Sequence, residues 1–433
     1  MQHPPPAPSF REALAFWARL GVVSFGGPAG QIAIMHTFLV DQKRWISDRK
    51  FLHALNYCML LPGPEAQQLA TYTGWMLHGV RGGLAAGILF VLPSTLILLG
   101  LSVLYVTYGA LPMVQAAFLF LKPAVVAIVA GAIVKIGKKS LQSPVHYLVA
   151  AAAFLAIYWG NVPFPLIIAG AILTGIAMYR ISAVKGLPNK QGADEDASER
   201  GWLINSHTVL DHTGFSWPRL LRQGIVALLL WLVPLLLLAV GTNFDFWKRL
   251  CLFFTQAALV TFGGAYAVLP YVAQVSVEKF GWLTHLEMLD GLALGETTPG
   301  PLIMVLAFVG FMAGYHTFSG SLGAATLGLA LTVYYTFLPS FLFIFAGAPL
   351  IERTQTNPAV KSVLQYATSA VVGVILSLCL FLGKAVIAPH APHIEWPALL
   401  WTIISLVALQ IFKVNLMWWI GVSVVAGVIW SAV

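Results

Sequence analysis

Two short stretches decide the fold of this chain, Ser24-Phe25-Gly26-Gly27-Pro28 and Leu61-Pro62-Gly63-Pro64-Glu65. Each interrupts an apolar segment, the first within residues 10–40 and the second within residues 51–77. Both return farther along the chain, as Thr261-Phe262-Gly263-Gly264 and Pro299-Gly300-Pro301. The offset is the same for both pairs, because 261 − 24 and 299 − 62 both equal 237. A pair of breaks duplicated at constant spacing indicates an internal repeat.

The repeat extends well beyond the breaks. Trp45 recurs as Trp282 at the same offset, and Gly137-Lys138 recurs as Gly383-Lys384 at an offset of 246 (384 − 138), as a nine-residue insertion before Pro339 would give. We therefore predict two homologous halves, a polar cytoplasmic linker and an apolar connecting span. Their expected ranges are 10–180 for the first half, 181–222 for the linker, 223–241 for the span and 247–431 for the second half.

The composition places both halves in a membrane. Of the 433 residues, 59% are hydrophobic and 9% are charged, whereas about 25% of the residues of a soluble protein are charged. Apolar runs long enough to cross a bilayer occur in both halves, for example at 83–108 and 321–346. We predict an all-α polytopic membrane protein. The three cysteines stand singly, and His390, His393 and Glu395, which have loose metal-ligand spacing, lie among prolines and are interpreted as a connector, so neither a metal nor a cofactor is expected.

The positions of the basic residues predict that the second half is inverted. Lys and Arg in short loops mark the cytoplasmic side. In the first half they cluster at 43–50, at Arg81 and at 135–139, whereas the matching loops of the second half nearly lack them. An odd number of spans between the halves would have this effect, so we predict an inverted-topology repeat, as in many secondary transporters. The net charge of +8 thus records topology and does not indicate a nucleic-acid partner.

The breaks are the predicted functional site. Broken helices persist at membrane depth where they line a cavity, and a helix N-terminus with its free amides binds anions. Four such N-termini, two from each half, suit a small oxyanion, although any single break has the alternative of a packing kink. The predicted binding residues are the break residues and the neutral donors beside them: Phe25, Gly26, Gly27, Pro28, Pro62, Gly63, Pro64, Gln67, Phe262, Gly263, Gly264, Thr297, Thr298, Pro299, Gly300 and Pro301.

Two acids flank these breaks in otherwise apolar sequence, Glu65 and Glu296. An ionisable residue at membrane depth is a functional hypothesis by default, and burial favours the uncharged form of a carboxyl group. We predict that both couple protons, with stabilisation of a helix N-terminus as an equal alternative for Glu65. Asp290 is expected to be solvated at the segment entrance. Arg44 is expected either to anchor the chain at the cytoplasmic surface or to attract anions to the inner mouth.

The ordered set of Phe25-Gly26-Gly27-Pro28, Arg44-Trp45 and Pro62-Gly63-Pro64, with its second copy, resembles the chromate ion transporter family in its long-chain, two-domain form. The resemblance covers nearly the whole chain outside the linker. It implies a multi-pass protein of the bacterial inner (plasma) membrane that exports chromate with the proton motive force and confers chromate resistance. The second half departs from the pattern at Ala265 and Gly281, which stand at the positions of Pro28 and Arg44.

The sequence thus predicts a secondary transporter that exports chromate by alternating access. Its expected partners are chromate or a similar oxyanion, protons and the lipid bilayer, and a homodimer is left open as an assembly. Transport of another anion, such as sulfate or a small organic acid, is the main alternative. An intramembrane enzyme is disfavoured because no HExxH, GxSxG or paired-Asp motif is present.

Overall fold

The computed structural model describes the chain in these ranges: 5–24, 27–59, 61–184, 201–205, 208, 216–241, 243–262, 264–354, 358–389 and 393–432. Three residues of the predicted site, Phe25, Gly26 and Gly263, lie outside the described residues. Within these ranges the secondary structure is helical, apart from one isolated bridge between Ile46 and Ile204.

The helices of the first half begin and end as follows: α1 (Phe10–Val23), α2 (Gly27–His36), the π-helical turn η1 (Thr37–Gln42), α3 (Asp48–Cys58), α4 (Glu65–Tyr108), α5 (Pro112–Ser140), α6 (Pro144–Tyr158) and α7 (Phe164–Val184). Helix α4 is bent at His78 and Gly79, where the backbone leaves helical geometry and Gly79 has a φ of 61°. It therefore consists of a half-helix that follows the Pro-Gly-Pro break and a long apolar span.

The second half repeats this order of elements: α9 (Phe244–Leu259), α10 (Ala265–Gln274), the π-helical turn η3 (Val275–Lys279), α11 (His285–Thr297), the 3₁₀ turn η4 (Leu302–Met304), α12 (Val305–Thr317), α13 (Leu322–Thr354), α14 (Pro358–Ile387), α15 (Trp396–Leu406), the π-helical turn η5 (Val407–Ile411) and α16 (Leu416–Ala432). Here α12 and α13 are separate helices where α4 is bent. The helix between the halves, α8 (Trp217–Ala239), begins before the predicted span at residue 223.

Six helices in the described ranges are long and apolar enough to cross a membrane: Glu65–Tyr108, Pro112–Ser140, Phe164–Ile181, Trp217–Ala239, Leu322–Gly347 and Ser362–Ile387. Their outward faces are apolar. Helix α8 is the clearest case, because Leu228, Leu236 and Leu237 are exposed and only Leu235 of its residues is buried. Apolar side chains on this scale need lipid around them. The prediction of an all-α polytopic membrane protein is confirmed.

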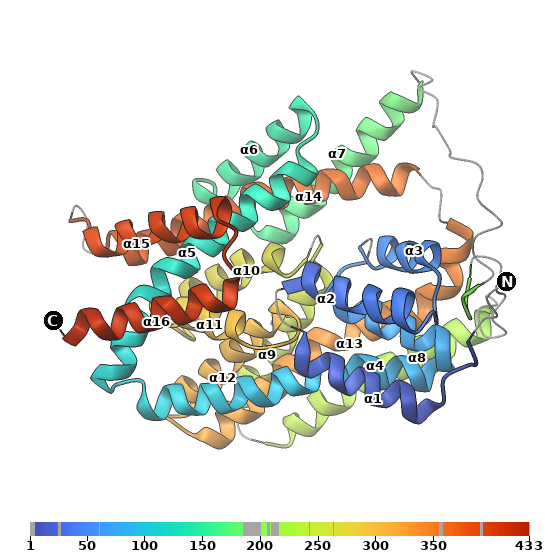
Figure 1. Cartoon of the computed structure of the whole chain (residues 1–433), viewed down its shortest axis with the longest axis horizontal. Helices are drawn as coiled ribbons and strands as arrows, with labels where there is room; N and C mark the ends of the chain where they lie inside the picture. The colour runs from blue at the N-terminus through green and yellow to red at the C-terminus, as the bar shows by residue number, and fades with distance from the viewer. Residues whose placement is uncertain are drawn as a thin grey trace.

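One long helix of each half, α5 in the first and α14 in the second, packs against the terminal helices of the other half. Helix α5 packs on α15 and α16, while α14 packs on α6 and α7, and the two also pack on each other. Figure 1 shows α5 and α14 running in opposite directions along the long axis, with α15 and α16 beside α5. Glycines allow close approach: a Cβ on Gly373 would stand against the Ala150 carbonyl, and one on Gly427 against that of Ala116.

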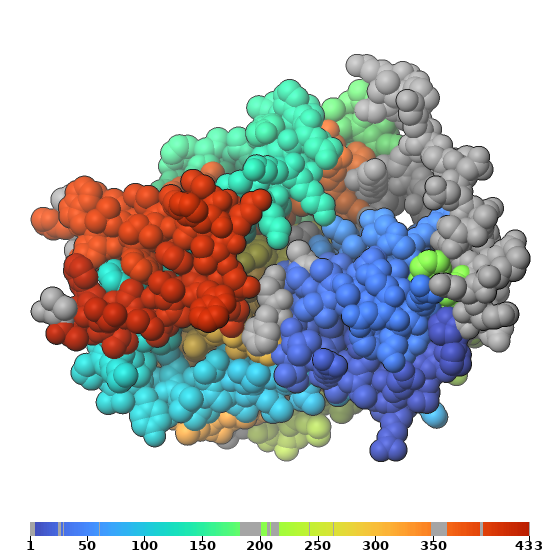
Figure 2. Space-filling view, in the orientation of Figure 1, coloured from blue at the N-terminus to red at the C-terminus, as the bar shows by residue number. Residues whose placement is uncertain are grey.

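Part of the predicted linker is packed against the first half. The amide N–H of Leu203 donates to the Arg44 carbonyl at 3.0 Å, and Ser47 N–H donates to the Ile204 carbonyl at 2.8 Å. Trp202 donates its indole N–H to the Val40 carbonyl at 3.0 Å. Figure 2 shows this short green segment against the blue surface of the first half. The linker is thus anchored at residues 201–205, and residues 185–200 lie outside the described part of the chain.

Candidate anion-binding site

Backbone hydrogen bonds link the four breaks in two pairs, and each pair joins a break of the first half to a break of the second half. The amide N–H of Gly63 donates to the Thr261 carbonyl at 2.8 Å, and the amide N–H of Gly300 donates to the Ser24 carbonyl at 2.8 Å. Each Pro-Gly-Pro break is therefore hydrogen-bonded to the residue that opens the Phe-Gly-Gly break of the other half. The backbone groups freed by the two kinds of break satisfy one another, as buried polar groups in lipid must.

Glycine is required at the centre of each Pro-Gly-Pro break. Gly63 has a φ of 127° and Gly300 a φ of 95°, a region that side-chain-bearing residues rarely adopt. Space is short as well: a Cβ on Gly63 would lie 2.6 Å from Ser340 Oγ, and one on Gly300 would lie 2.8 Å from Ser94 Cβ. Each break therefore rests against a serine from the long span of the opposite half.

Ser94 and Ser340 escaped the sequence analysis, although a signal for them exists. Leu92-Pro93-Ser94 recurs as Leu338-Pro339-Ser340 at the later offset, since 340 − 94 equals 246. Their exposed fractions are 0% and 1%. Neither hydroxyl has a hydrogen-bond partner. A duplicated, buried and unpaired serine beside each break is therefore a feature of the site.

Three buried glutamines surround the breaks. Gln31 Nε2 donates to the carbonyls of Ser24, at 3.3 Å, and of Gly300. Gln68 Nε2 donates to the Pro62 carbonyl at 2.8 Å. Gln67, which the sequence predicted, donates to Thr71 Oγ1 at 3.1 Å. Gln31 was not predicted, because its partner Gly300 is 269 residues away and nothing local in the sequence points to it.

Helix N-termini follow the breaks as expected. Helix α4 begins at Glu65 after Pro64, and α10 begins at Ala265 after Gly264, which has a φ of 94°. Helix α2 begins at Gly27. In the second half, the 3₁₀ turn η4 follows Pro301 and precedes α12. First-turn amides have no partner within their own helix, so these N-termini present donors toward the breaks.

Both predicted acids lie close to the beginning of α10. Glu65 Oε1 is 3.8 Å from the point at which a Cβ on Gly264 would stand, so this carboxylate reaches from the first half to the second. Glu296, near the end of α11, accepts a hydrogen bond of 2.6 Å from the hydroxyl of Tyr266. Both residues have an intermediate exposure, between the buried and the exposed residues of the chain.

The remaining predicted residues have other partners. Thr297 and Thr298 donate their hydroxyls to the carbonyls of Leu294, at 2.7 Å, and Gly295, at 2.9 Å, where they close the end of α11. Arg44 lies over the Trp202 ring at 6.0 Å, in the contact with the linker. Arg44 therefore lies against the linker. The hydroxyls of Thr297 and Thr298 are both hydrogen-bonded to backbone carbonyls at the end of α11.

An ion pair between a half-buried lysine and a buried aspartate joins the two halves. Lys122 Nζ of α5 lies 3.3 Å from Asp290 Oδ1 of α11, and the hydroxyl of Tyr105 donates to Asp290 Oδ2 at 2.8 Å. Asp290 is 4% exposed, so the expectation that it is solvated was wrong. The reason is that α5 and α4 of the first half cover α11, a contact that the sequence of α11 does not reveal.

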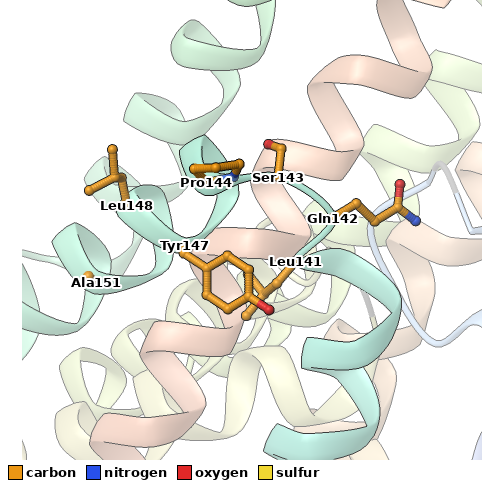
Figure 3. A pocket seen from close by; sticks show the side chains of 7 residues that line it. All are labelled: Leu141, Gln142, Ser143, Pro144, Tyr147, Leu148 and Ala151. Carbon is orange, nitrogen blue, oxygen red and sulfur yellow. The ribbon is translucent and has the colours of Figure 1, made fainter.

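Surface hollows lie elsewhere. One is at the α5–α6 connection, where Figure 3 shows Tyr147 turned toward Leu141, with Gln142 and Ser143 along its rim. No charged side chain lines this hollow. A second hollow is lined by Arg249, Phe280 and His316 of the second half. Neither of these two hollows includes a break residue.

The family described as Chromate transporter matches residues 11–176 and 248–428. The chain belongs to the chromate transporter family. The two matched segments lie close to the two predicted halves, and the resemblance inferred from the breaks is confirmed. The breaks of this chain, its two acids Glu65 and Glu296 and its three buried glutamines all lie within the matched segments.

Curated relatives extend over most of the chain. It is 28% identical over 386 residues to a probable chromate transport protein of Synechococcus elongatus, covering 88% of this chain and 86% of that protein. The chromate transport protein of Cupriavidus metallidurans is 28% identical over 413 residues, 95% of this chain and 90% of the relative. That of Pseudomonas aeruginosa is 31% identical over 378 residues, 86% of this chain and 80% of the relative. No solved structure matches the chain.

Proposed function

We propose that this protein is a secondary transporter that exports chromate, or a similar tetrahedral oxyanion, across the bacterial inner membrane. The observation that carries the proposal is the crosswise pairing of the breaks, Gly63 with Thr261 and Gly300 with Ser24. This pairing gathers helix N-termini from both halves, which is the arrangement an anion requires. Membership of the chromate transporter family names the anion.

The halves are proposed to be inverted repeats that alternate access to the breaks. Support comes from α5 and α14, which occupy matching places in the order of elements and run in opposite directions (Figure 1). Each also packs on the terminal helices of the other half. A rocking motion of one half against the other would open and close the crossed breaks in turn.

Glu65 and Glu296 are the proposed proton-coupling residues, and their helix positions differ. Glu65 is the first residue of α4, where the positive end of the helix dipole stabilises a carboxylate. Glu296 is near the last residue of α11, where the negative end disfavours charge, and Tyr266 supplies one hydrogen bond. Glu296 is therefore the better placed of the two to carry a proton.

Uptake of labelled chromate by inverted membrane vesicles tests the proposal. With an acidic interior, we expect chromate to accumulate, and a protonophore to abolish the accumulation. Competition with unlabelled sulfate and with a small organic acid identifies the preferred anion. Uptake that is insensitive to the protonophore would remove proton coupling, and the absence of any chromate uptake would overturn the function.

Substitutions test the proposed proton-coupling roles of Glu65 and Glu296. Glu65→Gln is expected to insert normally but to abolish the exclusion of chromate by cells, and normal resistance in this variant would remove Glu65 from the mechanism. Glu296→Gln is expected to eliminate the response to the pH gradient. Glu395→Gln is the matched control, because Glu395 is an exposed residue before α15. It should transport as the wild type does.

A further inference from the structure

The helices that precede the two Pro-Gly-Pro breaks, α3 and α11, hold matching places in the two halves but have different surroundings. Helix α11 packs on α5 of the first half and on α14 of its own half (Figure 1). Because α5 and α14 correspond to each other, α3 would pack on the same two helices if the halves were symmetric. Within the described ranges α3 instead packs chiefly on α4, and the Tyr57 hydroxyl ties it to the second half by donating to the Phe343 carbonyl at 3.2 Å.

The exposure of matching side chains differs in the same way. Leu52 of α3 is 44% exposed, whereas Leu289, 237 positions later, is 0% exposed. Asn56 is exposed, whereas Ala293 at its matching position is 0% exposed. An asparagine side chain is costly to place in lipid, so we expect water around Asn56. The face of α3 is therefore open at the place where the face of α11 is covered.

Polar contacts with the first half hold α11 in its covered position. Asp290 of α11 receives Lys122 Nζ of α5 at 3.3 Å and the hydroxyl of Tyr105 of α4 at 2.8 Å. At the matching places stand His53, for Asp290, and Thr368, for Lys122. Thr368 carries no charge and donates its hydroxyl to a carbonyl of its own helix at 2.8 Å. These two residues therefore cannot form an ion pair that would hold α3 in the same way.

The three contact residues lie on one side of the membrane in the predicted topology. The basic residues at 135–139 mark the cytoplasmic end of α5, and Arg81 marks that of the long span of α4. Lys122 and Tyr105 belong to the opposite parts of these two helices. Asp290, near the beginning of α11 in the inverted half, joins them there. The covered side is thus the external one, and the open side at α3 is the cytoplasmic one.

We propose that Lys122, Asp290 and Tyr105 form an inter-half latch that closes the external side of the transport path, and that the structure is the state open to the cytoplasm. Opening the external side requires α11 to leave α5 and Asp290 to give up both partners. Closing the cytoplasmic side brings α3 toward α14, where no ion pair compensates. The latch therefore favours the state from which an exporter takes up its substrate. This inference rests on the proposed alternating access, and it names the state and the residues that hold it.

The test is the labelling of introduced cysteines by a membrane-impermeant maleimide, without substrate. Asn56→Cys and Ala293→Cys are compared in inverted vesicles, which expose the cytoplasmic side, and in right-side-out vesicles. We expect Asn56→Cys to react in inverted vesicles and Ala293→Cys to stay unlabelled in both. Peptide mass spectrometry separates these sites from the native Cys58, Cys251 and Cys379. Labelling of Ala293→Cys in right-side-out vesicles as fast as that of Asn56→Cys in inverted ones would overturn the inference.

Variants of the latch should open the external side. Lys122→Gln combined with Asp290→Asn removes both charges, and Tyr105→Phe removes one hydrogen bond. The double variant should speed the labelling of Ala293→Cys about tenfold, the factor expected when one state alone loses a hydrogen bond to a charged group. Tyr105→Phe should act in the same direction and more weakly. Unchanged labelling of Ala293→Cys in both variants would overturn the latch.

A general loss of stability is distinguished by Cys251, which is 0% exposed in α9. Local opening leaves Cys251 unlabelled, whereas global loosening exposes it together with Ala293→Cys, and that result would contradict the latch. Glu12→Gln combined with Lys43→Gln is the matched control, because this exposed ion pair lies within the first half. It should leave all labelling rates unchanged.

Chromate uptake by the same vesicles separates the two proposals. Uptake by the wild type together with fast external labelling of Ala293→Cys would overturn the latch and leave the proposed function in place. The expected labelling pattern without any chromate uptake would overturn the proposed function and leave the latch in place.

Discussion

The two Pro-Gly-Pro breaks have the same backbone and differ in the side chains that follow it. Gly63 and Gly300 both have positive φ, and both donate to a carbonyl of the opposite half. After the first break come Glu65, Gln67 and Gln68, whereas Leu302, Met304 and Val305 occupy the matching positions after the second. The two breaks thus share a backbone geometry, whereas these three polar side chains follow only the first break.

The helices before the breaks differ in charge in the same way. In α3 the positions of Lys50 and His53 correspond, at the 237 offset, to Glu287 and Asp290 in α11. At these two positions α3 carries basic groups and α11 carries acidic groups, whereas Asp48 of α3 corresponds to His285 of α11 in the opposite order. In an inverted repeat these helices would face opposite sides of the membrane. The difference teaches that matching positions of α3 and α11 carry side chains of opposite charge.

The largest effect is expected from the ion pair between Lys122 of the first half and Asp290 of the second half. Asp290→Leu leaves Lys122, whose side chain is 22% exposed, without its counter-ion and should lower the free energy of unfolding by about 3 kcal/mol. Adding Lys122→Met to this variant should restore most of the lost free energy of unfolding, because an apolar pair replaces the ion pair at little cost in stability. Denaturant unfolding in detergent measures both. A double variant as unstable as Asp290→Leu would show that the ion pair is not the cause.

The shared backbone is tested by Gly63→Ala and Gly300→Ala. Positive φ alone should cost about 1–3 kcal/mol in each variant, and the contacts with Ser340 and Ser94 add to it. The two losses should be similar, because the breaks are alike in backbone. Gly421→Ala is the control, since a Cβ there meets no atom within 4 Å. Thermal unfolding measures the stability of the variants. A large loss of stability at only one of the two breaks would contradict their structural equivalence.

A smaller effect is expected from Gln31, which has Val268 at its matching position. Gln31→Met removes the hydrogen bonds to Ser24 and Gly300 and should cost about 1 kcal/mol. Gln115→Met, at an exposed position of α5, serves as the control. Unfolding of the two variants side by side measures the difference. Equal stability would mean that Gln31 does not hold the halves together.

The smallest effect is expected at one pair of surface positions that the halves use differently. In the first half Lys43 Nζ is 2.8 Å from Glu12, whereas in the second half Arg249 lies over the Phe280 ring at 5.6 Å. Lys43→Ala should cost about 0.5 kcal/mol or less, because the pair is exposed, and the loss should vanish at high salt. Unfolding at two salt concentrations measures this. A loss that persists in high salt would contradict an ion-pair origin.

Sequence reasoning reached the parts of the site that repeat in the chain. The Gly63 and Gly300 breaks, and Glu65 and Glu296 beside them, stand out in apolar sequence. Gln31 and the burial of Asp290 were missed, because their partners come from the other half. Gly281 in place of Arg44 was taken as a departure, yet the two residues have φ values of 61° and 53°. The backbone is the same there, and glycine adopts it at lower cost.

The exchange of α5 and α14 has a consequence for biosynthesis. Helix α5 is made well before α15 and α16, which cover it. Until these two helices have been made, α5 lacks their cover, so it cannot reach its final packing before then. A chain cut short before α15 would lose the cover of a helix made nearly three hundred residues earlier (396 − 112 = 284).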